Sequence, residues 1–166
     1  NPLLIKKKKF HLRVLLLNLN RRENKKLFIF KKFFVYPALK EFNLSSKNKN
    51  VHNSHGSKYT EKDLKKFIKE YERELSKDVR DDITKKIMVI SKGLKEYMEY
   101  KCYSESKNCY QYLGMDIMIT DDYKVKCIEL NMRPGTVGPS IFDTFWSGLI
   151  DLTLLGKSKT EDYVEL

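Results

Sequence analysis

The sequence contains no run of about 18 apolar residues, which is the length that a membrane-spanning helix requires. Its most apolar segment, LRVLLLNLN at residues 12–20, is too short to cross a bilayer, and no small-residue cleavage site of a signal peptide follows it. Disorder is excluded as well, because 41% of the 166 residues are hydrophobic, enough to bury a core. We therefore expect a soluble, folded protein.

Cysteine is scarce, and its arrangement excludes a disulfide framework. Cys102, Cys109 and Cys127 are odd in number and form no C-x-x-C pair, which fits a reducing compartment. His52, His55 and a nearby cysteine could bind zinc, but their spacing matches no standard zinc site.

Arginine is scarce too, because lysine supplies all but six of the 33 basic residues. The formal net charge of +11 favours an acidic partner, but nucleic acid, an anionic membrane and an acidic protein tail all satisfy that criterion. Codon bias can also produce such a lysine- and asparagine-rich chain, with most lysines on solvated faces. Nucleic acid is the least favoured partner, because the aromatic residues fall on core-facing stripes rather than beside basic loop residues.

Two strand-like segments near the start of the chain predict a β-hairpin. KKKFHLRVLLLNLN at residues 7–20 is followed by the turn-prone RRENKK and then by LFIFKKFFVY at residues 27–36. A period of two residues gives the first strand a cationic face and an apolar face, made respectively of Lys9, His11 and Arg13 and of Phe10, Leu12 and Val14.

Two amphipathic helices are predicted in the middle of the chain. Pro37 ends or bends the second strand, and the polar residues 43–58 predict a loop. Thr60 and Asp63 resemble a capping box that opens a helix of about 17 residues, and a second helix runs to about residue 100, with Gly93 as its weakest point. The apolar positions at helical spacing are Leu64, Phe67, Ile68, Tyr71 and Leu75, then Val79, Ile83, Ile87, Ile90, Leu94, Tyr97 and Met98.

The segment YLGMDIMITDDYKVKCIELNM at residues 112–132 predicts a second hairpin. A turn centred on Asp122 and Tyr123 would put Asp116 directly opposite Glu129, and Gly114 opposite Asn131. The alternation assigns these apolar residues to the core face: Met115, Ile117, Ile119, Ile128 and Leu130. After it, Pro139 opens a helix whose apolar stripe is Ile141, Phe142, Phe145, Trp146, Leu149 and Ile150. We find no internal repeat, so the predicted class is α+β, with an antiparallel sheet from two hairpins in the order ββ-αα-ββ-α.

Two opposed carboxylates destabilise a sheet unless a cation lies between them or solvent screens them. One interpretation is therefore the solvated face of an edge hairpin. The other is a Mg²⁺ site made by Asp116, Glu129 and the amide of Asn131, because Mg²⁺ takes one or two carboxylates together with substrate phosphates. Lys9 and Arg13 offer donors for phosphate oxygens on one strand face, which favours metal-bound polyphosphate.

These same residues carry a resemblance to the tubulin–tyrosine ligase family. KKFHLRVLLL resembles its K-F-D-[IL]-R strand, LFIFKK its Y-L-Y-R-E-G strand, and NVHNSHGSK its H-L-T-N loop. YLGMDIMITDDYKVKCIELNMRPG is similar to its F-G-F-D-F-M-V-D…W-L-I-E-V-N-x-x-P hairpin, whose D…E-x-N pattern is the most specific part. The resemblance runs from about residue 6 to residue 155.

The resemblance implies an ATP-grasp fold and ATP-dependent ligation of an amino acid to a protein carboxylate, usually on a tubulin tail, through an acyl phosphate. By position it implies these roles: phosphate or acyl-phosphate contacts for Lys9, Arg13 and Lys31, a place near the nucleotide for Asn53, Mg²⁺ ligation by Asp116, Glu129 and Asn131, and catalysis by Arg13 and Glu129. It implies a cytoplasmic protein that is associated with the cytoskeleton, with tubulin or another acidic tail and a free amino acid as partners, and no membrane.

Three positions depart from the family pattern. His11 stands in place of an Asp, Lys31 in place of an Arg, and His52 in place of a Thr. They suggest either an altered substrate or an impaired enzyme that remains as a basic module for acidic tubulin tails or microtubules. Because the chain begins at Asn1 rather than Met, we also expect residues 1–166 to be the C-terminal part of an ATP-grasp ligase domain, with the N-terminal portion absent. The isolated chain should then bind ATP poorly and be inactive.

Overall fold

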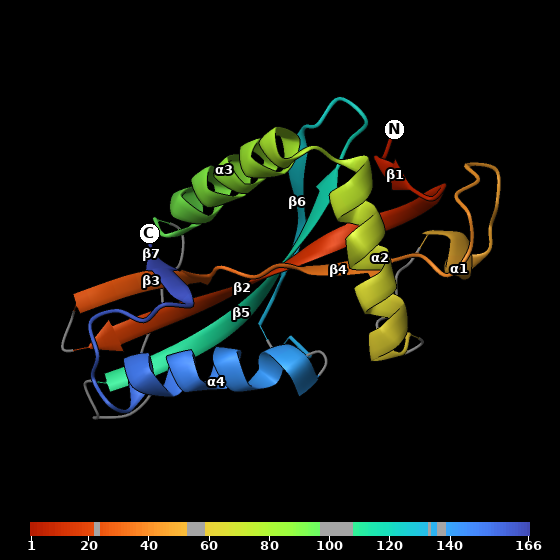
Figure 1. The fold of residues 1–166 in the computed structure, drawn as a ribbon. Coiled ribbons are helices and arrows are strands. Elements are labelled where there is room, and N and C mark those ends of the chain that lie inside the picture. The colour runs from red at the N-terminus through yellow and green to blue at the C-terminus, as the bar shows by residue number, and fades with distance from the viewer. Residues whose placement is uncertain (22–23, 53–58, 97–107, 133, 136–138) are drawn as a thin grey trace. The chain divides into compact units, whose positions relative to one another are not determined.

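The computed structural model contains helices and antiparallel strands in an α+β arrangement (Figure 1). It describes residues 1–21, 24–52, 59–96, 108–132, 134–135 and 139–166. Along the chain the elements are β1 (Leu4–Ile5), β2 (Lys8–Arg21), β3 (Asn24–Phe30), β4 (Phe34–Pro37), α1 (Lys49–His52), α2 (Glu61–Glu74), α3 (Lys77–Leu94), β5 (Asn108–Ile119), β6 (Val125–Asn131), α4 (Pro139–Thr153) and β7 (Tyr163–Glu165). The predicted α+β class and antiparallel sheet are therefore confirmed.

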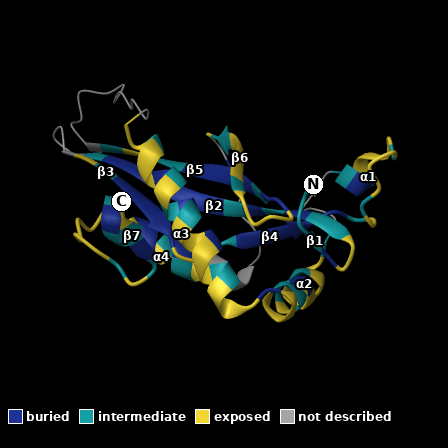
Figure 2. Cartoon of the chain, turned by 90° about the horizontal axis from the view of Figure 1, so that it is seen from above, coloured by how far each residue is buried: buried dark blue, intermediate teal, exposed yellow. Residues whose placement is uncertain are grey.

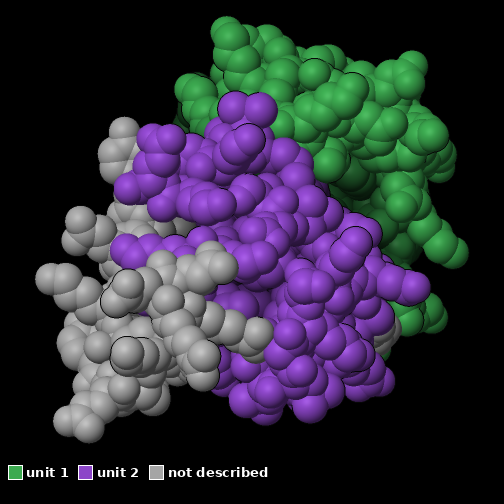
Figure 3. All heavy atoms as spheres, turned by 90° about the vertical axis from the view of Figure 1, so that its left-hand side faces the viewer, with its two compact units in different colours: residues 1–13, 34–87, 116–129 green, residues 14–33, 88–115, 130–166 purple. Residues whose placement is uncertain are grey.

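The chain divides into two compact units, which Figure 3 shows in green and purple. Unit 1 contains residues 1–13, 34–87 and 116–129, and unit 2 contains residues 14–33, 88–115 and 130–166. Four elements contribute residues to both units: β2, α3, β5 and β6. None of the described helices is both long enough and apolar enough to span a membrane.

In unit 1, the start of β2 pairs antiparallel with β1 and with β4. The predicted alternation holds, because Phe10 and Leu12 are buried while Lys9, His11 and Arg13 are partly exposed. The Phe10 ring packs on the rings of Phe67 and Tyr71, with centroids 6.1 and 5.7 Å away. These contacts fix α2, which lies beside β4 and β1 (Figure 1), to the apolar face of β2.

Both predicted helices form, and the first begins at the predicted cap. The Thr60 hydroxyl accepts a hydrogen bond from the Asp63 N–H at 3.2 Å, and the Asp63 carboxylate accepts one from the Thr60 N–H at 3.1 Å. Arg80 of α3 donates hydrogen bonds to the carbonyl oxygens of Glu72 and Leu75, which ties the two helices together. The second helix ends at Leu94, directly after Gly93, and the predicted Tyr97 and Met98 lie outside the described residues.

In unit 2, the rest of β2 pairs antiparallel with β3, and β3 pairs with β7. The Phe145 ring of α4 packs edge-on against Phe30 of β3 at 5.5 Å, and the Tyr163 hydroxyl of β7 donates to the Phe145 carbonyl at 3.1 Å. Tyr112 of β5 also packs on Phe145, at 6.2 Å. An aromatic cluster therefore holds α4 against the strands.

The structure corrects the prediction of a single second strand. β3 ends at Phe30 and β4 starts at Phe34, so the strand breaks at residues 31–33, before the bend expected at Pro37, and Lys31 lies exposed in the break. The short strands β1 and β7 were not predicted, and residues 43–58, expected to be a loop, contain the helical turn α1.

Two apolar residues assigned to the core are exposed. Ile128 of β6 is 55% exposed and Ile150 of α4 is 41% exposed. The strand order β6-β5-β2-β3-β7 places β6 at an edge, where a side chain has a neighbouring strand on one side only. Figure 2 shows the result, with β6 largely exposed and β5 buried.

The cysteine prediction is also corrected. Cys109 is disulfide-bonded. Cys127, on β6, is free and exposed.

Candidate functional site

The centre of the candidate site is an ion pair between two strands of unit 1. Arg13 on β2 donates from Nε to Asp116 Oδ1 and from Nη2 to Asp116 Oδ2, both at 2.7 Å. The two side chains are 15% and 10% exposed. Two parallel hydrogen bonds from one guanidinium edge fix both the position and the plane of the guanidinium group.

The pair is fully charged near neutral pH. The hydrogen bond to Asp116 raises the pKa of the Arg13 guanidinium above its ordinary value. Burial is the largest single influence and opposes ionisation of the Asp116 carboxyl, but the hydrogen bonds from Arg13 and the charges of His11 and Arg13 together hold the pKa of Asp116 below its ordinary value. The site therefore combines one fixed positive and one fixed negative group.

A second carboxylate lies next to this pair. Glu129 of β6 lies close enough to influence the pKa of Asp116, and its charge also raises the pKa of Arg13. The two carboxyl groups that the sequence pattern put on one face are thus neighbours. Glu129 itself is exposed, so ligands can reach it from solvent.

The hairpin turn that brings these strands together differs from the predicted one. The Thr120 N–H donates to the Lys124 carbonyl and the Tyr123 N–H donates to the Thr120 carbonyl, both at 2.9 Å. Tyr123 has φ 58°, in the left-handed region. The turn is thus a three-residue loop centred on Asp122 rather than a two-residue loop.

His11, which stands where the family pattern has Asp, is an aromatic neighbour of the ion pair. Its ring stacks on Tyr36 of β4 at 5.1 Å, and its Nε2 lies 3.7 Å from Asp116 Oδ1. Burial lowers the pKa of His11 to about 4, although the Asp116 charge opposes this shift. His11 is therefore neutral at pH 7, and the salt bridge at that pH belongs to Arg13 and Asp116.

The remaining predicted site residues are placed as follows. Lys9 lies on the same strand face as His11 and contributes to lowering the pKa of that histidine. Lys31 is exposed in unit 2, where its backbone N–H donates to the Asp162 carbonyl at 2.9 Å. Asn131, also in unit 2, is partly exposed and follows Glu129 by two residues in β6.

The loop that carries Asn53 and His55 lies outside the described residues. His52, at the end of α1, is described: its Nε2 lies 2.5 Å from the Ser46 carbonyl oxygen, and its ring packs edge-on against Phe42 at 5.9 Å. Among the described residues, no group of three or more His, Cys, Asp and Glu side chains could hold a metal ion. The zinc alternative therefore gains no support from the described part of the chain.

The donor chemistry of the carboxylate pair nevertheless fits Mg²⁺, which binds through one or two carboxylates and keeps several waters. Each Asp116 oxygen accepts one hydrogen bond from Arg13, and a carboxylate oxygen has a second lone pair to offer. Glu129 is accessible beside it. Asp116 and Glu129 would thus supply both carboxylate ligands.

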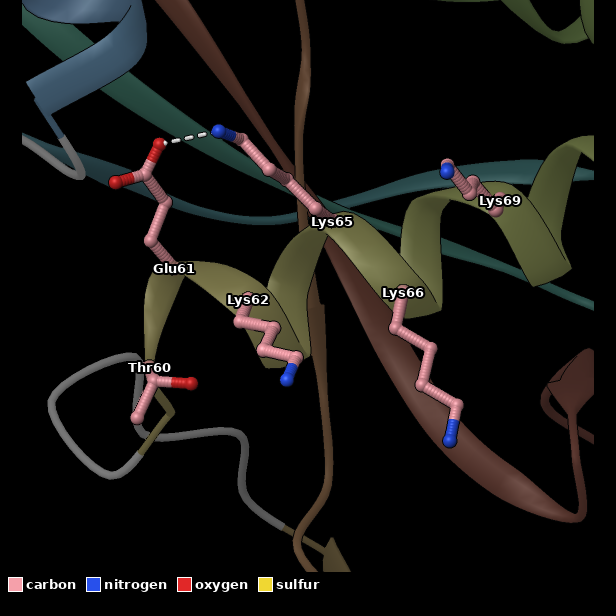
Figure 4. A pocket seen from close by; sticks show the side chains of 6 residues that line it. All are labelled: Thr60, Glu61, Lys62, Lys65, Lys66 and Lys69. Atoms are coloured by element: carbon pink, nitrogen blue, oxygen red, sulfur yellow. Dashed lines mark ion pairs between the residues drawn. The ribbon is translucent and has the colours of Figure 1, made fainter.

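Unit 1 also carries a basic groove of about 780 Å³ along the first turns of α2 (Figure 4). The residues that line it are Thr60, Glu61, Lys62, Lys65, Lys66 and Lys69. Lys65 pairs with Glu61 at 2.8 Å, while no ion pair to a described residue engages the other three lysines. This groove, which we call the α2 lysine groove, offers several positive charges to an acidic ligand.

Comparison with known proteins identifies a family. The model of the tubulin-tyrosine ligase family matches residues 1–155, which include all the site residues described above. No curated protein gives a significant match to the chain.

Proposed function

Because the chain belongs to the tubulin-tyrosine ligase family, we propose that it acts as an ATP- and Mg²⁺-dependent ligase that joins an amino acid to a protein carboxylate. Family membership indicates ATP-dependent ligase activity in general. The observation that supports the specific reaction is the Arg13–Asp116 pair with Glu129 beside it. It combines an anion-binding guanidinium with two carboxylates suited to a hard cation.

In the proposed site, Asp116 and Glu129 hold Mg²⁺, and Asn131 joins them on the evidence of the sequence pattern. The ion would neutralise charge on the nucleotide phosphates when bound. Arg13 binds the phosphoryl group that is transferred. Lys9, Lys31 and Asn53 are proposed as further nucleotide contacts on the resemblance alone.

The proposed reaction has two steps. An oxygen of the acceptor carboxylate attacks the γ-phosphorus of ATP, ADP leaves, and an acyl phosphate forms. The amino group of the incoming amino acid then attacks the acyl carbon, and inorganic phosphate leaves. Arg13 contributes by holding the transferring phosphoryl group in line and by stabilising its charge, and its guanidinium is already oriented by Asp116.

The proposed biological setting rests on the resemblance to the family. We propose that the acceptor is the acidic tail of tubulin or of a similar protein, and that the protein works in the cytoplasm at the cytoskeleton. We propose that residues 1–166 form the C-terminal part of an ATP-grasp ligase domain. The net charge of +11 is compatible with an acidic acceptor.

An assay of the full-length protein with ATP, Mg²⁺ and tubulin, and with Tyr, Glu or Gly offered in turn, tests this function. We expect one amino acid to be incorporated, and Glu129→Gln to abolish incorporation because a metal ligand is lost. Glu161→Gln, which changes an exposed carboxylate elsewhere, is the matched control and should leave incorporation unchanged. Incorporation that is the same in both variants would contradict the proposed metal site.

The α2 lysine groove favours one alternative, a basic module that binds acidic tails without ligation. Lys62→Glu with Lys66→Glu should then abolish cosedimentation with microtubules, while Lys25→Glu, at another exposed lysine, should weaken it little. ATP turnover separates the alternatives, because only the ligase consumes ATP when tubulin and an amino acid are present.

A further inference from the structure

Tyr36 carries a buried hydroxyl group that no other described residue engages. The residue is 4% exposed, and its hydroxyl oxygen has no hydrogen-bond partner among the residues that the structure describes. Burying a hydroxyl without a partner costs free energy, and most buried polar atoms in native proteins are hydrogen-bonded. An unpaired buried hydroxyl therefore suggests a partner that binds from outside the chain.

The ring of Tyr36 is held against the site on two sides. Tyr36 pairs directly with His11 across β4 and β2, and the two rings are stacked at 5.1 Å with 29° between their planes. The guanidinium carbon of Arg13 lies 5.7 Å from the centre of the Tyr36 ring, within the range of a cation–π contact. The ring thus borders the guanidinium group whose edge is bound by Asp116.

The hydroxyl is a donor that lies near the charged pair. Burial raises the pKa of Tyr36 to about 12, and the charges of Arg13 and Asp116 also act on it. The group therefore keeps its proton at neutral pH and can donate it in a hydrogen bond.

Arg13, whose guanidinium carbon lies over the Tyr36 ring, has further hydrogen-bond donors. A guanidinium group has five N–H bonds, and the two hydrogen bonds to Asp116 use two of them. The other three have no acceptor in the described part of the chain. The described residues therefore leave hydrogen-bond donors unused on both Arg13 and Tyr36, and an anionic oxygen group would accept from both.

We propose that Tyr36 binds the γ-phosphoryl group of ATP together with Arg13, with its hydroxyl donating to a phosphoryl oxygen and its ring fixing the guanidinium plane. This inference rests on the proposed function, which makes that phosphoryl group the ligand of Arg13. A phosphoryl group fits because its three oxygens can accept from both side chains at once. An ordered water on the hydroxyl is the competing explanation.

Calorimetry of the full-length protein with Mg²⁺-ATP and with Mg²⁺-ADP tests the hydroxyl contact. Tyr36→Phe keeps the ring and removes only the hydroxyl, so ATP affinity should fall about 10-fold, as expected for a hydrogen bond to a charged group, while ADP affinity should stay unchanged. Tyr71→Phe, which alters a partly buried tyrosine of α2, is the control and should change neither affinity. An unchanged ratio of ATP to ADP affinity in Tyr36→Phe would overturn the inference and favour the water.

The same titrations separate this inference from the proposed function. If the parent protein binds neither nucleotide, both the proposed function and the role of Tyr36 are overturned. If the parent binds ATP but Tyr36→Phe leaves the ratio of ATP to ADP affinity unchanged, only the role of Tyr36 is overturned.

The role of the ring is tested by Tyr36→Leu, which should lower kcat below that of Tyr36→Phe at saturating ATP, because the guanidinium plane is then less restricted. Equal kcat values for the two variants would overturn the positioning role of the ring.

Discussion

At the scale of single residues, the site depends on one contact between distant parts of the sequence. Arg13 and Asp116 are 103 residues apart, yet their side chains meet in two hydrogen bonds of 2.7 Å. Such a pair is weak evidence for stability, because both charges lose water when they are buried. The pair matters for orientation, because its two hydrogen bonds fix the direction in which the remaining N–H groups of Arg13 point.

Substitution of Arg13 tests this orientation. Arg13→Ala in the full-length protein should lower the rate of ligation by about 100-fold or more, because it removes a charged donor to the transferring group. Arg13→Lys keeps the charge but loses the planar fork, so it should recover only part of the rate. Lys25→Ala, at an exposed lysine, is the control and should change the rate little.

Urea unfolding of the Arg13 variants belongs to this test, because Arg13→Ala leaves the buried Asp116 charge without its partner. We expect that loss to cost about 3 kcal/mol or more in unfolding free energy. Rates must therefore be compared at a temperature where every variant is folded. Equal ligation rates for Arg13→Ala, Lys25→Ala and the parent would contradict a role for the guanidinium.

His11 makes stability depend on pH. Between pH 6.5 and about 4, a histidine in the unfolded chain is protonated while folded His11 stays neutral, so the unfolded state binds more protons. The unfolding free energy should therefore fall by about 2 to 3 kcal/mol as pH falls from 7 to 4.5. Urea unfolding at both pH values, without metal or nucleotide, measures this fall.

His11→Gln is the control for that prediction. It has no titrating ring, so its unfolding free energy should change much less over the same pH range. The Asp116 contribution is lost only below pH 3.8, the ordinary pKa of an aspartate, and does not interfere. Identical pH dependence in the parent and in His11→Gln would show that His11 is not buried in its neutral form.

At the scale of elements, the sequence predicted what depends on near neighbours. Local patterns were sufficient to predict two features whose residues lie close together in the chain: the capping box of Thr60 and Asp63, and the helix that opens at Pro139. The strand β7 and the exposure of Ile128 were missed, because they depend on which strands pair. Strand pairing is a long-range property, and alternation alone does not tell an edge strand from a central one.

Substitution of Thr60 tests the cap of α2. Thr60→Ala should lower the unfolding free energy by about 1 kcal/mol, because the Asp63 N–H loses its acceptor. Thr60→Ser should restore most of it. Thr84→Ala, inside α3, is the matched control and should cost nothing, since alanine is the better helix former. A Thr60→Ala variant as stable as the parent in urea unfolding would show that the cap contributes nothing.

Two helical glycines give a contrasting pair of predictions. A Cβ atom at Gly148 of α4 would lie 2.7 Å from Tyr163 Cε2, and Tyr163 cannot move freely because its hydroxyl bonds Phe145. Gly148→Ala should therefore destabilise the protein by about 1 to 3 kcal/mol. A Cβ atom at Gly93 of α3 would meet no atom within 4 Å, so Gly93→Ala should stabilise the protein by up to about 1 kcal/mol. Denaturation midpoints that move in the same direction would contradict the packing described for α4.

At the scale of the whole molecule, the sequence predicted which residues meet at the centre of the candidate site, but it did not predict all of their neighbours. Arg13, Asp116 and Glu129 were found because alternation and the family resemblance agreed on them. Tyr36 was missed, because its place opposite His11 depends on the register of β4 on β2. That register follows the break between Phe30 and Phe34, which no local signal in the sequence predicted.

The central claim is that a protein carboxylate is phosphorylated by ATP and then joined to an amino acid. The most direct measurement uses a glutamate-rich acceptor peptide with ¹⁸O in its carboxylates, together with the full-length protein, Mg²⁺-ATP and the amino acid that is incorporated. We predict ADP and inorganic phosphate in equal amounts, with one ¹⁸O atom in each phosphate, because the acyl phosphate carries an acceptor oxygen to the phosphorus. Unlabelled phosphate, or ¹⁸O that appears in AMP, would contradict this account.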